Sequence, residues 1–290
     1  MTTTTSTVRM PGLSQQEFRR LASFIESRCG IQMPDSKKTM VTARLQKRLR
    51  VLKMQSFSDY VDWVLDPHRA GDELIHFIDM VTTNKTDFFR EPNHFVFMAD
   101  DAIPDLIKRS GAGVKRPLQV WSAPCSTGEE PYTMAMVILE FAAKNPKFNL
   151  KAQILGTDLS TRALKKGQNA VYEMERVAPV TLAMKKKYML KSKDRNNPLV
   201  RMAPALRAMV RFQQINFMDD TYAISQKMDI VFCRNMLIYF DRPTTEKVVN
   251  KICRHINPGG YLFVGHSETL KDIKVPVVQV RPTIYQMPEK

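Results

Sequence analysis

The stretch that decides the fold runs from Val120 to Pro131 and reads Val-Trp-Ser-Ala-Pro-Cys-Ser-Thr-Gly-Glu-Glu-Pro. Its apolar start belongs to a short strand expected at Leu118–Ala123, and its polar end leads into a helix expected at Gly128–Ala143. A buried strand followed directly by a turn and a helix is the repeating unit of α/β proteins. The chain from Leu118 onward is therefore expected to form an α/β sheet.

The same alternation continues toward the end of the chain. Two apolar runs around Arg281 and Pro282 predict a closing antiparallel strand or hairpin within Val275–Met287. Strands that alternate with helices form mainly parallel sheets covered on both faces. The further strands are expected at 153–157, 228–233 and 260–264, and the further helices at 160–168 and 243–255.

The residues before this sheet, from Ser14 to about Thr83, carry only helical signals. In the helix expected at Ser36–Lys53, an apolar stripe lies beside a basic one when the residues are placed about 100° apart. On the pattern alone, ordinary solvated surface charge is favoured for the basic stripe, and a docking face for an acidic partner is the alternative. The apolar stripe consists of Val41, Leu45, Leu49 and Leu52, and the basic one of Lys37, Arg44 and Arg48, with Lys47 nearby.

The segment from Ala170 to Phe212 interrupts the alternation and is rich in Lys, Arg and Met. It is expected to form a small inserted subdomain. Its pattern does not choose between a helix and a hairpin.

Composition limits the classes of partner and site. The formal net charge is +15, which indicates an anionic partner such as nucleic acid, an acidic membrane surface or an acidic protein. The four cysteines and five histidines show no spacing typical of a metal site, so no metal is expected. No apolar run reaches the roughly 20 residues of a membrane span, and we expect a cytoplasmic protein without membrane insertion.

The turn at Ser122–Pro131 lacks both the glycine pattern of dinucleotide sites and the Gly-Lys-Ser/Thr of phosphate loops. Small residues and two carboxylates, Glu129 and Glu130, suit a positively charged sulfonium ligand with an amino-acid end better than an anionic ligand. The alternative is that this turn only caps the following helix.

Polar residues follow two other strands. Asp158 ends the strand at 153–157, where a carboxylate can accept hydrogen bonds from ribose hydroxyls, although an N-cap is the alternative. Arg234 and Asn235 directly follow the strand at 228–233, with Tyr239 just beyond. Arg234 as a surface ion pair and Tyr239 as a core aromatic are the alternatives.

Four motifs in order resemble the CheR family of bacterial chemotaxis-receptor glutamate methyltransferases. They begin at Thr83, Trp121, Phe232 and Gly265, and they span most of the chain. As they stand here they read Thr83-Asn84-x-Thr86-x-Phe88-Phe89-Arg90-Glu91, Trp121-Ser122-Ala123-x-Cys125-Ser126-Thr127-Gly128-Glu129-Glu130-Pro131-Tyr132, Phe232-Cys233-Arg234-Asn235-x-x-Ile238-Tyr239-Phe240 and Gly265-His266-Ser267-Glu268.

The resemblance implies a small all-helical N-terminal domain followed by a class I, Rossmann-like methyltransferase domain that binds S-adenosylmethionine and carries an inserted β-subdomain. On this basis we expect domains at 1–90 and 91–290, with the insertion at about 170–212. Pro124 departs from the family, which more often has a small residue there. The residues implied to bind the cofactor are Asn84, Thr86, Arg90, Glu129, Asp158, Asn216, Phe217, Arg234 and Asn235, and Arg90 and Tyr239 are those implied near the transferred methyl.

The resemblance also implies the partner. The substrate is expected to be glutamate in the cytoplasmic domain of a transmembrane chemoreceptor, with S-adenosylhomocysteine as the other product. Lys37, Arg44, Lys47 and Arg48 would dock it. In some members the subdomain binds a receptor tail peptide as an extra strand. The protein is expected to act as a monomer.

Two other functions compete with this one. A nucleic-acid methyltransferase would account for the charge, but Arg234-Asn235-Met236-Leu237 is not the motif of base methylation. A non-catalytic sensor of the cofactor or its product is the alternative from another class.

Overall fold

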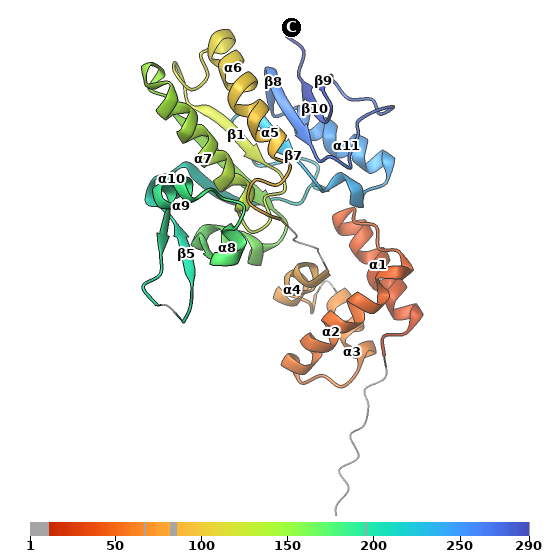
Figure 1. Ribbon diagram of the computed structural model, residues 1–290. Helices are drawn as coiled ribbons and strands as arrows, with labels where there is room; N and C mark the ends of the chain where they lie inside the picture. The colour runs from red at the N-terminus through yellow and green to blue at the C-terminus, as the bar shows by residue number, and fades with distance from the viewer. Residues whose placement is uncertain (1–11, 67, 82–85, 195, 290) are drawn as a thin grey trace, which may run out of the picture. The chain divides into compact units, whose positions relative to one another are not determined.

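The computed structural model describes residues 12–66, 68–81, 86–194 and 196–289. The chain forms two compact units, Met1–Thr83 and Asn84–Lys290 (Figure 1). The division places the described residues 86–90 with the second unit, whereas the expected boundary placed them with the first. Among the described residues, no helix has both the length and the apolar character that a membrane crossing requires.

The first unit is all-helical in its described part, as predicted. α1 begins at a capping box, in which Ser14 accepts from the Glu17 amide and the Glu17 side chain accepts from the Ser14 amide. Its apolar face buries Phe18, Leu21 and Ile25. The elements are α1 (Gln15–Cys29), the 3₁₀ turn η1 (Asp35–Lys37), α2 (Lys38–Leu52), α3 (Phe57–Leu65) and α4 (Asp72–Val81).

A buried carboxylate joins three of these helices. Glu73 of α4 is 4% exposed and accepts from Arg48 Nε of α2 at 3.0 Å and from the Tyr60 hydroxyl of α3 at 2.8 Å. Arg44 Nη1 donates to the Met80 carbonyl at 2.6 Å. Two residues of the expected docking face therefore make contacts inside the unit, whereas Lys47 is exposed.

The second unit contains a seven-stranded sheet in the order β6-β2-β1-β7-β8-β10-β9. The first five strands in this order run parallel, and β10 pairs antiparallel with β8 and with β9, which confirms the predicted closing hairpin. The strands of this sheet are β1 (Leu118–Ser122), β2 (Ala152–Asp158), β6 (Val210–Gln214), β7 (Met228–Cys233), β8 (Ile256–Val264), β9 (Val278–Arg281) and β10 (Ile284–Gln286).

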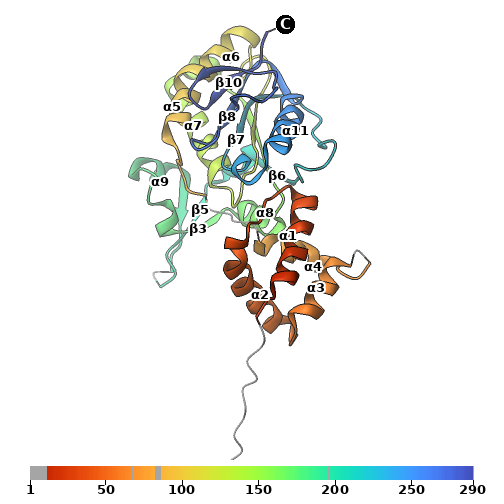
Figure 2. The same cartoon turned by 90° about the vertical axis from the view of Figure 1, so that its right-hand side faces the viewer.

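Helices cover both faces of this sheet, with α6 and α7 on one side and α11 on the other (Figures 1 and 2). Ser122 lies opposite Gly156 of β2 and Phe232 of β7, so the parallel strands end at one edge. Loops that follow these strands converge there. The helices are α5 (Pro92–Phe97), the π-helical segment η2 (Met98–Ala102), α6 (Ile103–Ser110), α7 (Glu129–Lys144), η3 (Pro146–Phe148), α8 (Thr161–Asn169), η5 (Leu237–Tyr239) and α11 (Arg242–Cys253).

The inserted subdomain contains a separate three-stranded antiparallel sheet in the order β3-β5-β4, which extends away from the large sheet (Figure 1). The expected insertion ended at Phe212, but Val210–Gln214 forms β6 and pairs with β2 of the large sheet. The elements of the insertion are β3 (Val171–Glu173), η4 (Met174–Val177), α9 (Leu182–Tyr188), β4 (Met189–Lys191), β5 (Leu199–Met202) and α10 (Pro204–Met209).

We expect Arg48→Ala to lower the free energy of unfolding of the first unit by about 2–3 kcal/mol, because it leaves the buried Glu73 carboxylate without its cation. Lys47→Ala is the matched control and should stay within about 0.5 kcal/mol of the wild type, since its side chain is exposed. Urea unfolding of the full chain, with amide hydrogen exchange in α2 as the local readout, measures both. Equal stability of the two variants would contradict a structural role for Arg48.

Candidate functional site

The loop after β1 is fixed by its neighbours on both sides. The Ala123 amide donates to the Phe232 carbonyl of β7 at 2.8 Å, and the Cys125 amide donates to the Thr157 carbonyl of β2 at 2.7 Å. The Ala123–Pro124 peptide bond is cis. These contacts set the path of the loop that the sequence singled out.

Asp158, at the end of β2, contacts the same loop. Its Oδ2 accepts from the Ser126 amide at 2.8 Å and its Oδ1 accepts from the Ser160 amide at 2.9 Å. The side chain is buried. Asp158 therefore positions the loop through the Ser126 amide and the start of α8 through the Ser160 amide.

Glu129 begins α7 and is 0% exposed. Its Oε2 accepts from Thr127 Oγ1 at 2.6 Å, and its Oε1 accepts from Arg176 Nη2 at 2.9 Å. Gly128 precedes it with φ +95°, and a Cβ there would lie 2.8 Å from the Tyr172 hydroxyl. Only glycine fits this turn without displacing Tyr172.

Asn216 and Phe217 follow β6, next to Asp158, whose carbonyl accepts from the Ile215 amide at 3.1 Å. Two buried side chains fix the conformation of this turn by donating to the Phe217 carbonyl. The donors are the Lys251 ammonium, at 2.6 Å, and the Tyr222 hydroxyl, at 2.9 Å. Burial lowers the pKa of Lys251. Asn216 and Phe217, which the resemblance implied in cofactor binding, thus lie on a turn with a defined conformation.

The segment that carries Arg90 has an unusual backbone. Phe89 and Glu91, on either side of half-buried Arg90, have φ of +55° and +57°, the left-handed region that side chains other than glycine rarely adopt. Such strain persists where the surroundings impose it, and it concentrates at functional sites. Thr86, which begins this segment, is buried, and Asn84 lies outside the described residues.

Arg234, expected to meet the cofactor, lies inside the protein with a side chain 2% exposed. Its Nε donates to Glu130 Oε2 at 2.8 Å, its Nη2 to the Arg90 carbonyl at 2.8 Å and its Nη1 to His94 Nδ1 at 3.0 Å. Ser122 Oγ donates to the other oxygen of Glu130 at 2.7 Å. The guanidinium therefore joins the ends of β1 and β7 to the Arg90 segment.

Glu268 determines the conformation of the loop that carries Asn235 and Tyr239. Its Oε2 accepts from the amides of Asn235 at 2.9 Å and Gly265 at 2.6 Å, and its Oε1 accepts from the amide of Leu237 at 2.7 Å. Asn235 has φ +59° and its Nδ2 donates to Glu91 Oε1 at 3.3 Å. Half-buried Tyr239 follows at the end of η5, so one carboxylate organises its loop.

Glu91, His94 and His266 each bring a potential metal-ligating atom within 4.8 Å of the others. Arg234 already supplies positive charge at this position, because its Nη1 is 3.5 Å from Glu91 Oε2 and donates to His94 Nδ1. A divalent cation here would face a guanidinium at close range, so we assign no metal to this group.

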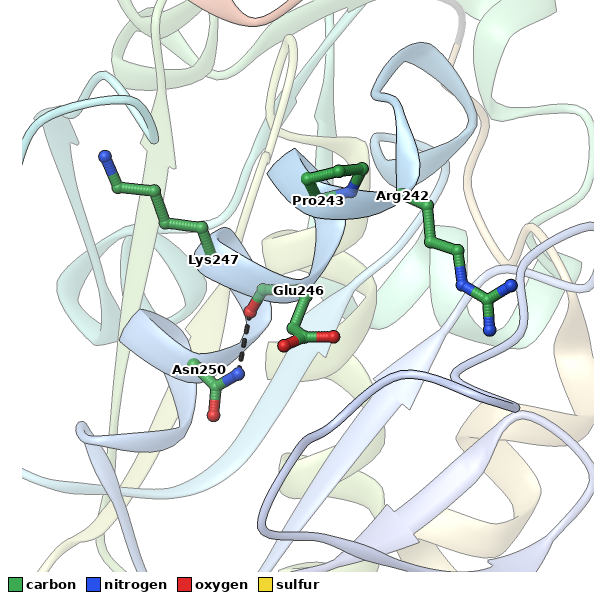
Figure 3. A pocket seen from close by; sticks show the side chains of 5 residues that line it. All are labelled: Arg242, Pro243, Glu246, Lys247 and Asn250. Atoms are coloured by element: carbon green, nitrogen blue, oxygen red, sulfur yellow. Dashed lines mark hydrogen bonds between the residues drawn. The ribbon is translucent and has the colours of Figure 1, made fainter.

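A surface depression of about 460 Å³ on α11 lies among Arg242, Pro243, Glu246, Lys247 and Asn250 (Figure 3). The helix side chains at this face fix the loop before β9. Glu246 Oε2 accepts from the Lys274 amide at 3.0 Å, and Asn250 Nδ2 donates to the Lys274 carbonyl at 2.7 Å. We assign this depression to the attachment of that loop.

Comparison with known proteins identifies the family. Residues 84–285 match the family model described as CheR methyltransferase, SAM binding domain, and residues 16–82 match CheR methyltransferase, all-alpha domain. The chain belongs to the CheR methyltransferase family. It is therefore a methyltransferase dependent on S-adenosylmethionine, as predicted.

Relatives resemble the chain over nearly its whole length. The chemotaxis protein methyltransferase of Borreliella burgdorferi is 34% identical, and the match covers 90% of this chain and 91% of the relative. Chemotaxis protein methyltransferase 2 of Pseudomonas aeruginosa is 34% identical, and the match covers 94% of this chain and 93% of the relative. The chemotaxis protein methyltransferase of Escherichia coli is 33% identical, and the match covers 95% of this chain and 92% of the relative.

The residues at the strand ends fit the cofactor chemically. Buried Glu129 suits the ammonium of its amino-acid end, and Asp158, at the end of β2, suits the ribose hydroxyls. Sequence reasoning missed two residues that position other residues of the site: Glu268, which binds the loop of Asn235 and Tyr239, and Arg176, which binds Glu129. Glu268 lay in a recognised motif but had no assigned role, and Arg176 lay among many cations of the insertion, where no local signal distinguishes it.

We expect the second unit to lose stability as the pH falls from about 6.5 toward 4. Arg234 donates to His94 Nδ1, and His94 Nε2 lies 2.8 Å from Thr283 Oγ1, so His94 is neutral in the fold. Burial, and then the charge of Arg234, lower the pKa of His94 to about 4 from an ordinary 6.5. Because the pKa of His94 is lower in the folded state than in the unfolded state, its contribution to the free energy of unfolding is fully present above about pH 6.5. As the pH falls this contribution is lost, and at pH 5 the loss is about 2 kcal/mol.

Urea unfolding at pH 7.5 and pH 5 measures this loss. His94→Gln, which cannot titrate, should show a smaller difference between the two pH values. His68→Gln, at an exposed position of the first unit, should keep the wild-type difference. An unchanged difference in His94→Gln would assign the pH dependence to other groups.

Proposed function

We propose that this protein transfers the methyl group of S-adenosylmethionine to glutamate side chains in the cytoplasmic domain of chemoreceptors, forming glutamyl methyl esters. The relatives named chemotaxis protein methyltransferase support the receptor as substrate. The observation that carries the proposal is that Arg90 and Tyr239 lie on two segments joined by the Asn235–Glu91 and Arg234–Arg90 contacts.

The chemistry needs positioning more than proton transfer. The bound cofactor supplies a methyl group on a positively charged sulfur, whose bond to carbon breaks as the carboxylate oxygen forms the new one. Glutamate has an ordinary pKa of about 4.3 and is ionised at neutral pH, so no general base is required. Arg90 and Tyr239 would orient the carboxylate in line with the methyl at about 3–3.5 Å. A weak orienting contact is preferable, because a strong ion pair would stabilise the ground state.

The positive charge of the first unit would dock the acidic receptor. Arg44 and Arg48 are engaged by Met80 and Glu73, so we assign electrostatic attraction chiefly to exposed Lys47 and leave Lys37 as a half-buried contributor. In the subdomain, β4 is an edge strand with Leu190 54% exposed. We propose this edge as the place where a receptor tail peptide would pair.

The deciding experiment incubates the protein and radiolabelled S-adenosylmethionine with receptor cytoplasmic fragments, with and without their C-terminal residues, and with DNA and RNA. We expect label on receptor glutamates that mild base releases as methanol. Label on nucleic acid alone would refute the proposal. Cofactor binding without methyl ester on any receptor of the organism would favour a sensor.

Tyr239→Phe should lower turnover about 10- to 100-fold while the dissociation constant of S-adenosylhomocysteine stays within about twofold, because only the orienting hydroxyl is lost. Calorimetry and initial rates on the receptor fragment measure the two quantities. Normal turnover in this variant would refute the orienting role of Tyr239.

Asp158→Ala should instead weaken cofactor binding, by at least about tenfold, because it removes a ribose acceptor together with the partner of the Ser126 amide. Asp220→Ala is the matched control, since the Asp220 side chain is 96% exposed. Binding equal to that of the control would contradict the assignment.

A further inference from the structure

Arg176 reaches from the inserted subdomain to the cofactor loop. It belongs to η4, directly after β3, and its Nη2 donates to Glu129 Oε1 at 2.9 Å and to the Thr86 carbonyl. Its Nη1 is 3.1 Å from Asp87 Oδ1. One guanidinium thus joins the insertion, the start of α7 and the segment that leads to Arg90.

Charge and burial make this contact important for Glu129. The Glu129 side chain is 0% exposed, and it forms an ion pair with Arg176. Its carboxylate also accepts from the neutral Thr127 hydroxyl. A buried carboxylate is costly without a compensating cation, so Arg176 supplies the positive charge that compensates this side chain and orients it.

The insertion makes a second contact with the same loop. Tyr172 of β3 is 1% exposed, and its hydroxyl donates to the Thr127 carbonyl at 2.8 Å. Its ring also packs edge-on against Phe88 at 5.1 Å between centroids. Tyr172 and Arg176 therefore contact both the cofactor loop and the segment before Arg90.

We propose that Arg176 is a positioning residue for the cofactor, which aligns Glu129 for the ammonium of the amino-acid end and so couples the inserted subdomain to cofactor affinity. This rests on the assignment of Glu129 in the proposed function. Carboxylate oxygens have two lone pairs each, so Glu129 can accept from Arg176 and from a ligand ammonium together. A lysine could not replace Arg176, because a single ammonium lacks the planar fork that reaches the three acceptors.

The test compares two ligands in calorimetric titrations of the full chain. S-adenosylhomocysteine has the amino-acid end, whereas 5′-methylthioadenosine shares the adenosine and lacks that end. We expect Arg176→Ala to weaken binding of S-adenosylhomocysteine about tenfold and to leave 5′-methylthioadenosine within about twofold. Arg201→Ala, at an exposed position of β5 in the same subdomain, should bind both as the wild type does.

Three outcomes would overturn the proposal. Unchanged binding of S-adenosylhomocysteine would show that Arg176 does not position Glu129. Equal loss for both ligands would mean that the substitution had only loosened the site. Tighter binding of S-adenosylhomocysteine would mean that Arg176 competes with the ligand ammonium. Arg176→Gln, which keeps much of the side-chain volume, replaces the alanine variant if that variant does not fold.

A double-mutant cycle separates this inference from the assignment on which it rests. Glu129→Gln should weaken S-adenosylhomocysteine and not 5′-methylthioadenosine, and adding Arg176→Ala should cause little further loss, because Arg176 acts through Glu129. Wild-type affinity in Glu129→Gln would refute the assignment of Glu129. Loss in Glu129→Gln with none in Arg176→Ala would refute only the role of Arg176.

Discussion

The geometry of the site depends on the buried guanidinium of Arg234. It follows β7, and its donors reach Glu130 of α7, His94 of α5 and the carbonyl of Arg90. Removing one partner of a buried charge is costly, so the positions of these segments depend on one another. The left-handed residues on either side of Arg90 are a consequence, because the segment must bring its carbonyl to this one position.

The charged groups at the strand ends fall into two sets. Glu130, Arg234, Glu268 and Lys251 bind protein atoms and define loop conformations. Glu129 and Asp158 also bind protein atoms, and they are the two that we propose to bind the cofactor as well. Fixing these carboxylates before the ligand arrives reduces the ordering cost of binding, and the methyl transfer proposed here requires accurate placement rather than proton transfer.

Local periodicity predicted most of the large sheet, because strands such as Met228–Cys233 are buried apolar runs and helices such as α8 have a start signal, here Ser160. It did not predict β6, which is only partly apolar and partly buried. Periodicity did not predict the small sheet, since β3 and β4 have three residues each and show no period, and only the family resemblance implied it. The basic stripe of α2 was visible, but the engagement of Arg48 depends on Glu73, 25 residues away. Arg176 pairs with Glu129 across 47 residues, and only the fold brings them together.

The way Glu268 holds the loop after β7 has an implication for sequence divergence. Its carboxylate contacts main-chain amides at Asn235, Leu237 and Gly265 and no side chain among them. The bonds to the amides of Leu237 and Ile238 therefore do not depend on which side chains stand at these two positions. A substitution of exposed Ile238 would leave its amide bond to Glu268 in place, so an acidic residue 30 positions away preserves the path of the backbone to Tyr239.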